Sequence, residues 1–374
     1  MKNPVRLRFY PVTFFLTILV VTCLSCDKLV TVFDEVENAD YLEKAQKASI
    51  PAPDSTISVM TWNMRFGIGR GPWFGDACGY KVIYPKDEIM VNLELIAARI
   101  KQVKPDILLL QEADIGSTRS AYVDELRWLL ANTYFNYCVH GSVWRAQWIP
   151  SDGLGRMDES NAIFSRWPLK DYKRIQFALR GDQSSIERYF YERDCMVEAR
   201  VEIPGFKSSY VVNAHASAFA TDDTKHQHLV EFKTELDRLA SSGEMFVGGG
   251  DLNSIPPGSA KTDYCMEDKC EGESFHNTGD NPMHKDGSDY TPEKQWLVPV
   301  FDTYKSVIPL SVMLNNPEAY FTHTTRPDHF WDRTLDYLFT NGRWKTGQSK
   351  VFQDFQPESD HAPVIGRIYL TKSN

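Results

Sequence analysis

Acidic, amide and imidazole side chains stand where several apolar runs of this sequence come to an end. They are Asn63, Glu112, His215, Asp251, Asn253, Asp336, Asp360 and His361. Carboxylate and amide oxygens are the ligands that magnesium, manganese and calcium prefer, whereas imidazole and thiolate suit zinc. No serine or cysteine nucleophile stands beside a base in this set. The set therefore favours attack by water assisted by a divalent metal.

The apolar runs themselves predict the strands that must position these side chains. Predicted strands cover residues 57–62, 106–110, 209–212, 244–247, 334–340 and 363–370. Residues 86–103 and 223–240 carry apolar side chains at helical spacing, so we expect amphipathic helices there. Strands interleaved with helices indicate an α/β scaffold, in which strand ends build the site. Three glycines, Gly248 to Gly250, precede Asp251, and we expect them to let the backbone turn sharply and approach a ligand closely.

Composition is that of a globular enzyme. The chain has 374 residues, of which 42% are hydrophobic and 24% charged, and it shows no internal repeat. The formal net charge of -9 argues against a protein that binds long nucleic acid through a basic face. A local basic strip at Arg326, Arg333, Arg343 and Lys345 is possible in principle, but a scattered solvated surface explains these residues at least as well.

The N-terminus predicts export. Lys2, Arg6 and Arg8 precede an apolar run too short to span a bilayer comfortably, so residues 1–25 are interpreted as a signal peptide. Its end at Cys26 resembles a bacterial lipoprotein signal, which would place the protein at the cell envelope with a lipid on Cys26. The alternative is an uncleaved membrane anchor. Residues 26–54 are expected to form a short helix or a tether, and residues 55–374 the domain.

Cysteines and a long polar stretch mark a further region. Export permits disulfides, and Cys265 with Cys270 is the expected pair. His276 and His284 nearby raise the alternative of a zinc site, although the spacing does not fit a familiar tetrahedral pattern. Residues 254–300 are polar and rich in Gly, Pro, Asp and Lys, so they are expected to form an insertion loop over one rim of the site.

Six short motifs in order carry a resemblance to a known family. They are Thr61-Trp62-Asn63, Leu110-Gln111-Glu112, Asn213-Ala214-His215, Gly250-Asp251-Leu252-Asn253, Leu335-Asp336-Tyr337 and Ser359-Asp360-His361. Together with the segment from Asp158 to Pro168, they resemble the ordered motifs of the endonuclease/exonuclease/phosphatase superfamily from residue 57 to the C-terminus. The resemblance implies a four-layer α/β fold, in which two mixed β-sheets pack as a sandwich with helices on both outer faces.

The resemblance also implies roles for the residues. Glu112 would be the principal ligand of Mg²⁺, or of Mn²⁺ or Ca²⁺, with Asn63 and Asp360 supporting the metal or the substrate phosphate. Asp251, steadied by Asn253, would orient and deprotonate the attacking water. His361, held by Asp336, and His215 would hydrogen-bond the phosphoryl oxygens in the transition state. Each residue also has a structural alternative, such as a turn, a cap, a core histidine or, for Asp336, an ion pair with Arg333.

Several further residues and the substrate stay open at this stage. Arg65 would grip a substrate phosphate, although a rim role is the stronger expectation for it and for Lys225, His226, His228, His323, His329 and Trp331-Asp332-Arg333. A small or lipid-linked phosphate ester is favoured over DNA or RNA, and a monomer is expected. The alternatives are a nuclease, a zinc-dependent hydrolase and an envelope lipoprotein of the same fold that binds without turnover.

Overall fold

The computed structural model describes residues 28–50, 54–76, 78–271, 288–326 and 328–373. The expected signal peptide and Cys26 lie outside these residues, as do His276 and His284. Within the described ranges, no helix is long and apolar enough to cross a bilayer.

Two seven-stranded mixed sheets pack face to face. The first sheet runs in the order β13 (Lys350–Val351), β14 (Val364–Tyr369), β3 (Thr56–Asn63), β4 (Ile107–Asp114), β6 (Gly155–Ser165), β5 (Tyr137–Ile149) and β2 (Asp40–Glu43). The second runs in the order β1 (Val36–Asn38), β7 (Leu169–Gln176), β8 (Cys195–Val201), β9 (Ser209–His215), β10 (Met245–Asp251), β12 (Asp336–Thr340) and β11 (Lys305–Ser306). The pairs β3–β4 and β9–β10 are parallel, whereas the other pairs are antiparallel.

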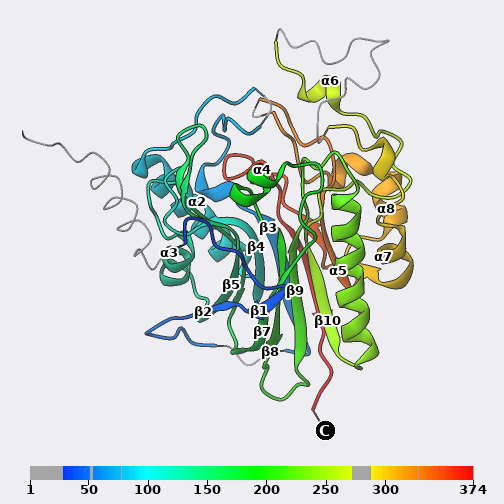
Figure 1. Cartoon of the computed structure of the whole chain (residues 1–374). Coiled ribbons are helices and arrows are strands. Elements are labelled where there is room, and N and C mark those ends of the chain that lie inside the picture. Colours follow the sequence, from blue (N-terminus) through cyan, green and yellow to red (C-terminus); the bar gives the residue numbers. More distant parts are fainter. Residues whose placement is uncertain (1–27, 51–53, 77, 272–287, 327, 374) are drawn as a thin grey trace, which may run out of the picture.

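Helices cover both outer faces of the sandwich, which confirms the expected four-layer fold (Figure 1). α2 (Lys86–Val103) and α3 (Glu125–Asn132) cover the first sheet, and α5 (Thr224–Ser241), α7 (Val298–Thr303) and α8 (Leu310–Asn315) lie on the side of the second. Two short helices, α4 (Ser185–Phe190) and α6 (Cys265–Asp268), lie in connections. The long helices α2 and α5 agree with the predicted ranges to within one residue at each end.

Alternation along the strands divides the core into layers. Val59 and Leu109 belong to a buried cluster with Val197 and Val211 of the facing sheet. Their neighbour Met60 points the other way, into a second cluster formed with α2. The strands at the centre of the sandwich are therefore buried on both faces, which explains why they appear in the sequence as continuous apolar runs.

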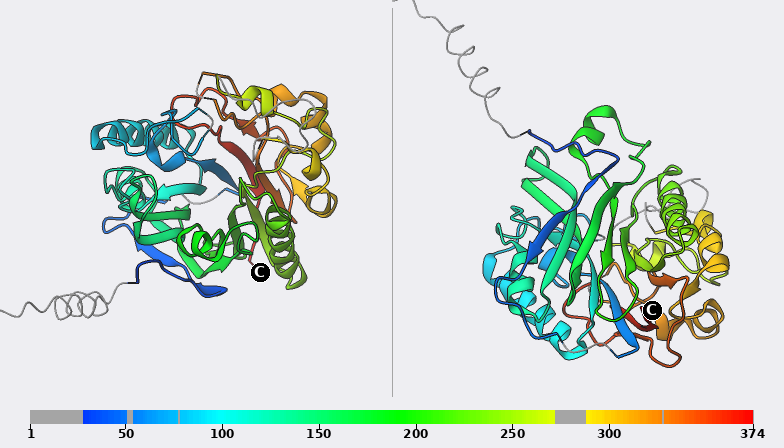
Figure 2. Two further views of the ribbon diagram at one scale, coloured as in Figure 1. Left: turned by 45° about the horizontal axis from the view of Figure 1, so that its top comes forward. Right: turned by 90° about the horizontal axis from the view of Figure 1, so that it is seen from below.

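The described part of residues 26–54 is integrated into both sheets and is neither a helix nor a free tether. β1 pairs with β7 and β2 pairs with β5. The expectation for this range was wrong because these strands follow a polar sequence at the sheet edges, where few apolar side chains signal a strand. Figure 2 shows this segment, in dark blue, lying along the sandwich in both views.

The expected pairing of Cys265 with Cys270 was also wrong. Cys270 is bonded to Cys78, 192 residues away in the sequence, and Cys265 is buried in α6. Proximity in sequence was a poor guide because the fold brings the loop after β3 against the insertion. The described parts of the insertion, 254–271 and 288–300, carry α6 and the beginning of α7.

The three glycines before Asp251 serve the packing of strands rather than a turn next to a ligand. All three lie within β10. A Cβ on Gly249 would lie 1.9 Å from the carbonyl oxygen of Tyr337, and one on Gly250 would lie 1.8 Å from that of Ala214. Only glycine permits this close approach of neighbouring backbones, and Gly250 also has a positive φ of +138°.

Candidate active site

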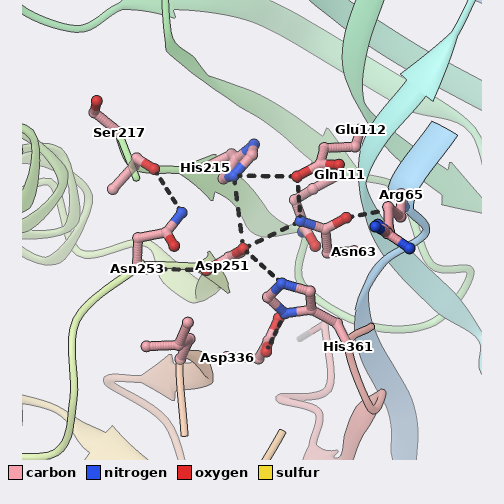
Figure 3. Close-up of polar contacts among 12 residues, drawn as sticks. Asn63, Arg65, Gln111, Glu112, His215, Ser217, Asp251, Asn253, Asp336 and His361 are labelled. Atoms are coloured by element: carbon pink, nitrogen blue, oxygen red, sulfur yellow. Dashed lines mark hydrogen bonds and ion pairs between the residues drawn. The ribbon is translucent and has the colours of Figure 1, made fainter. Parts of the chain in front are cut away.

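The predicted polar side chains converge at one end of the sandwich (Figure 3). The parallel pairs β3–β4 and β9–β10 both end there, so the side chains at or near their carboxyl ends face one another from the two sheets. The ligand atoms of Glu112, His215 and Asp251 all lie within 4.8 Å of one another. The predicted convergence of strand ends is therefore present in the structure.

Glu112 stands on a β-bulge. The register between β4 and β6 shifts between Leu110 and Ala113, and Glu112 takes a left-handed φ of +55°. A bulge re-aims a side chain out of the strand alternation, and an uncommon backbone conformation of this kind persists only where the surrounding structure fixes it. Burial and the neighbouring carboxylate of Glu159 raise the pKa of Glu112 to about 7, against the opposing effect of His215.

Asn63, at the end of β3, connects the two principal carboxylates. Its amide nitrogen donates to Glu112 Oε1 at 2.7 Å and to Asp251 Oδ2 at 3.1 Å, while its oxygen accepts from the backbone N–H of Arg65 at 3.0 Å. Both amide hydrogens are thus used to hold carboxylates. The arrangement makes Asn63 a bridge that fixes Glu112 relative to Asp251.

Asp251 is buried and surrounded by donors. Its Oδ2 lies 3.4 Å from His361 Nε2 and 3.6 Å from His215 Nε2. Its Oδ1 accepts a hydrogen bond of 2.9 Å from the backbone N–H of Asn253. Asn253 therefore steadies Asp251 as expected, but through its main chain, because its side chain donates to the carbonyl of Ala216.

His361 and Asp336 form a buried ion pair. His361 Nδ1 lies 2.8 Å from Asp336 Oδ2, which leaves Nε2 directed toward Asp251. Although burial disfavours the imidazolium, the carboxylates of Asp336 and Asp251 raise the pKa of His361 well above its usual range. Asp336 therefore belongs to His361, and the alternative partner, Arg333, is paired instead with Asp268 and Asp332.

His215 faces the same carboxylates from β9. Its Nε2 lies 3.7 Å from Glu112 Oε1 and 3.6 Å from Asp251 Oδ2. Burial opposes the charged form, but these two carboxylates outweigh it and raise the pKa of His215. The site thus presents two imidazoles that favour a positive charge, on opposite sides of Asp251.

Asp360 and Arg65 lie beside the Glu112 group. Arg65 Nε lies 3.1 Å from Asp360 Oδ2, and the guanidinium also binds the carboxylate of Asp76 and, at 2.7 Å, the carbonyl of Gly69. The guanidinium is 3% exposed, so it holds two carboxylates in place rather than reaching out as a rim residue. Asp360 is grouped with His323 and His361, whose ligand atoms lie within 4.8 Å of it.

Three of the residues expected at the rim are buried instead. His323 stacks near His361 with ring centroids 4.3 Å apart, and Lys225 donates to the carbonyl of Asn253 at 3.0 Å and to Glu293 at 2.6 Å. His228 is fully buried and accepts from or donates to backbone groups of neighbouring loops. The sequence did not single out Asp76, which lies in an irregular loop without a strand before it.

A cavity of about 890 Å³ opens directly over this group. Its acidic lining residues are Asp76, Glu112, Asp152, Glu159, Asp182, Glu187, Glu192, Asp194, Asp251 and Asp360. Its arginines are Arg65, Arg119 and Arg180, and each of them is already paired with a carboxylate. The cavity is large enough for a small organic ligand and is predominantly acidic.

The two-sheet sandwich and its acidic, imidazole-bearing cavity define a hydrolase-like α/β protein. The model of the endonuclease/exonuclease/phosphatase family matches residues 60–361, and the chain belongs to this family, whose members are typically hydrolases of phosphoric esters. A search of curated proteins found no match.

Solved structures of low sequence identity share the fold. An endonuclease/exonuclease/phosphatase from Beutenbergia cavernae is 20% identical with a TM-score of 0.55, over 84% of this chain and 72% of that one. The human nocturnin catalytic domain is 14% identical with a TM-score of 0.49, over 89% and 97% of the two chains. An endonuclease/exonuclease/phosphatase from Bacteroides vulgatus is 13% identical with a TM-score of 0.48, over 84% and 99%.

Proposed function

We propose that this protein hydrolyses a phosphate ester by in-line attack of water and that it needs a divalent cation, with Mg²⁺ as the first choice and Mn²⁺ or Ca²⁺ as alternatives. The observation that carries the proposal is the convergence of Glu112, Asp251 and His215 within 4.8 Å, beside the His361–Asp336 pair. Such a group offers both a base for water and donors for phosphoryl oxygens.

The donor set fits a hard cation. Glu112 and Asp251 present carboxylate oxygens to a common point, and no cysteine lines the cavity. Glu112 is partly exposed to the cavity, with 19% of its side chain accessible. Glu112 would hold the cation, supported by Asp360. When bound, such a cation would offset the negative charge that develops on the phosphoryl group.

The residues of this chain then divide the remaining work. Asp251, held by Asn63 and by the backbone of Asn253, is placed to orient a water molecule and accept its proton. His361, kept charged by Asp336, and His215 are placed to donate hydrogen bonds to phosphoryl oxygens. Donors fixed before the reaction stabilise the transition state without reorganisation.

The cavity lining supports a small or lipid-linked substrate over nucleic acid. Ten carboxylates and only three arginines, all paired, line it, and the whole chain carries a formal net charge of -9. A long polyanion would be repelled by this field, whereas a single phosphate ester can be offset locally by the cation. We further propose that the protein is exported to the bacterial envelope as a monomer and is anchored there through a lipid on Cys26.

A panel of substrates tests the proposal. The purified protein is assayed with a water-soluble aryl phosphodiester, an aryl phosphomonoester and plasmid DNA, after EDTA treatment and after addition of Mg²⁺ or Zn²⁺. We expect hydrolysis of an aryl ester that is restored by Mg²⁺. Plasmid DNA as the best substrate would support a nuclease instead, and no turnover of any ester would support a binding lipoprotein.

A further inference from the structure

Exposed apolar side chains border one side of the cavity mouth. Ile186 of α4 is 73% exposed and lines the cavity, while Tyr189, one helical turn further on, is 41% exposed. Trp148, at the end of β5, is 53% exposed and precedes Ile149 and Pro150, which also line the cavity. A hydrogen bond of 2.8 Å from Trp144 Nε1 to the carbonyl of Phe190 joins α4 to β5. Apolar side chains gathered in this way usually mark a contact surface.

The beginning of the described chain runs along the same edge. Val30 forms an antiparallel bridge with Ala146, and the backbone N–H of Gln147 donates to the carbonyl of Leu29 at 2.8 Å. Leu29 and Val32 add exposed fractions of 42% and 55% to the apolar surface. We call Leu29, Val32, Trp148, Ile186 and Tyr189 the mouth patch.

The covalent chain fixes how far this edge can lie from Cys26. Lys28 is the first described residue, and it follows Cys26 by two positions. Two residues span at most about 7 Å even when fully extended. A lipid on Cys26 would therefore hold the mouth patch against the bilayer surface, because residues 28–50 are built into the sheets and leave no long tether.

We propose that the mouth patch docks on the phospholipid bilayer that carries the lipid of Cys26, so that the cavity receives a phosphate ester linked to a lipid of that bilayer. This inference rests on the proposed function and on the proposed lipid attachment. Aromatic side chains such as Trp148 and Tyr189 suit the interface between headgroups and acyl chains, where one end of the ring is apolar and the other is hydrated.

The charges around the patch indicate apolar insertion rather than attraction to anionic lipid. Lys28 and Arg188 lie on or next to its segments, but so do Asp152 and Glu187. No surplus of basic side chains is present for binding a negatively charged surface. A zwitterionic phosphatidylcholine bilayer is therefore the appropriate partner for a test.

Tryptophan quenching tests the contact directly. The full chain, with its lipid, is reconstituted into vesicles of phosphatidylcholine with or without brominated acyl chains. Of the nine tryptophans, all within the described residues, only Trp148 is classed as exposed. We expect bromine to quench the wild-type fluorescence, and we expect Trp148→Phe to lose most of that quenching. Equal quenching in the two proteins, or none, would overturn the proposal.

Turnover in the same vesicles tests the consequence for the substrate. In Leu29→Ser/Trp148→Ser we expect hydrolysis of a lipid-linked phosphodiester in the bilayer to fall about tenfold, the effect of losing one buried large apolar side chain. Hydrolysis of a water-soluble aryl phosphodiester should stay unchanged, since neither residue lines the cavity. Val91→Ser/Val230→Ser, on the outer faces of α2 and α5, is the matched control, with exposed fractions of 60% and 51%.

The outcomes separate the docking proposal from the proposed function. If the wild type cleaves neither ester, the proposed function fails, while the quenching measurement still decides the docking. If the double variant behaves like the control, docking through the mouth patch is wrong even though the enzyme is active. A dimer that dissociates only in the double variant, measured by sedimentation in detergent, would assign the patch to a second copy of the chain and overturn the proposal.

Discussion

Gln111 donates a hydrogen bond of 2.5 Å from its side-chain nitrogen to Asn213 Oδ1, and this bond joins the two sheets directly beneath the site. Asn213 in turn donates to the backbone carbonyls of Leu110 and Ala162 at 2.8 and 2.9 Å. Glu112 follows Gln111, and His215 lies two residues after Asn213. The buried cross-sheet link therefore fixes the separation of the carboxylate from the imidazole.

Replacing Asn213 should destabilise the fold and disturb the site together. Asn213→Ala leaves two buried backbone carbonyls and the Gln111 amide without partners, so we expect the free energy of unfolding to fall by about 2 to 4 kcal/mol. Urea unfolding at pH 7 measures this. The exposed Asn132→Ala serves as the control, with an expected change within about 0.5 kcal/mol. An Asn213 variant as stable as the wild type would show that the link is dispensable.

Asp251→Asn should leave the fold intact and remove most of the activity. The substitution keeps the size of the side chain and its contact with the backbone N–H of Asn253, but an amide cannot accept the proton of water. We expect turnover to fall about a hundredfold to ten-thousandfold. Turnover of the aryl ester gives the activity, and circular dichroism checks the fold. Near-normal turnover in the purified variant would contradict the role of Asp251 as a base.

The His361–Asp336 pair predicts a graded loss of activity. His361→Ala removes a donor to the phosphoryl group and should cost about a hundredfold to a thousandfold in turnover. Asp336→Asn keeps the imidazole but removes the carboxylate that favours its charged form, so its loss should be smaller and should diminish at lower pH. Measuring the pH dependence of turnover for both variants tests this. A loss in Asp336→Asn that does not change with pH would reduce Asp336 to a packing role.

Much of the fold was predictable because its elements depend on local periodicity. The helical spacing in residues 86–103 and the apolar runs before Asn63, Glu112, His215 and Asp251 correspond to α2 and to the central strands. These strands are buried on both faces, so their sequences are continuously apolar and end visibly where the polar site begins. The same signal brought the site residues together correctly.

The features that escaped prediction depend on contacts between distant segments. Cys78 and Cys270 are adjacent only after the loop following β3 has packed against the insertion. The bulge that turns Glu112 into the site appears only in the pairing of β4 with β6. Arg65 gave no sign of its burial, because its partners Asp76 and Asp360 are brought to it by the tertiary fold. No short window of the sequence contains that information.

Removing divalent metal should abolish turnover and lower thermal stability. Carboxylates gathered around Glu112 repel one another, and a bound cation relieves this only in the folded state. We expect EDTA to stop hydrolysis and Mg²⁺ to restore it and raise Tm. Glu112→Gln should lose the increase in Tm caused by Mg²⁺, whereas Glu244→Gln, outside the cavity, should retain it. An unchanged Tm response in Glu112→Gln would exclude Glu112 as the principal ligand.

His140 predicts that stability falls on mild acidification, independently of the active site. It is 6% exposed in β5, and burial lowers its pKa to about 4. In the unfolded chain the pKa is about 6.5, so the unfolded state takes up a proton first as the pH falls. The contribution of His140 is therefore fully present above pH 6.5 and is lost progressively down to pH 4. Between pH 7 and pH 5 the loss is on the order of 2 kcal/mol.

Urea unfolding of the wild type and of His140→Gln at pH 7 and pH 5 isolates this contribution. Glutamine keeps a polar group near Ser160, 3.4 Å from the imidazole, but does not titrate. We expect the difference in unfolding free energy between the two pH values to be smaller in His140→Gln by the amount given above. His226→Gln, on the exposed side of α5, should show the wild-type difference. If His140→Gln and the wild type lose the same stability, His140 accepts a proton in the folded protein as readily as in the unfolded chain.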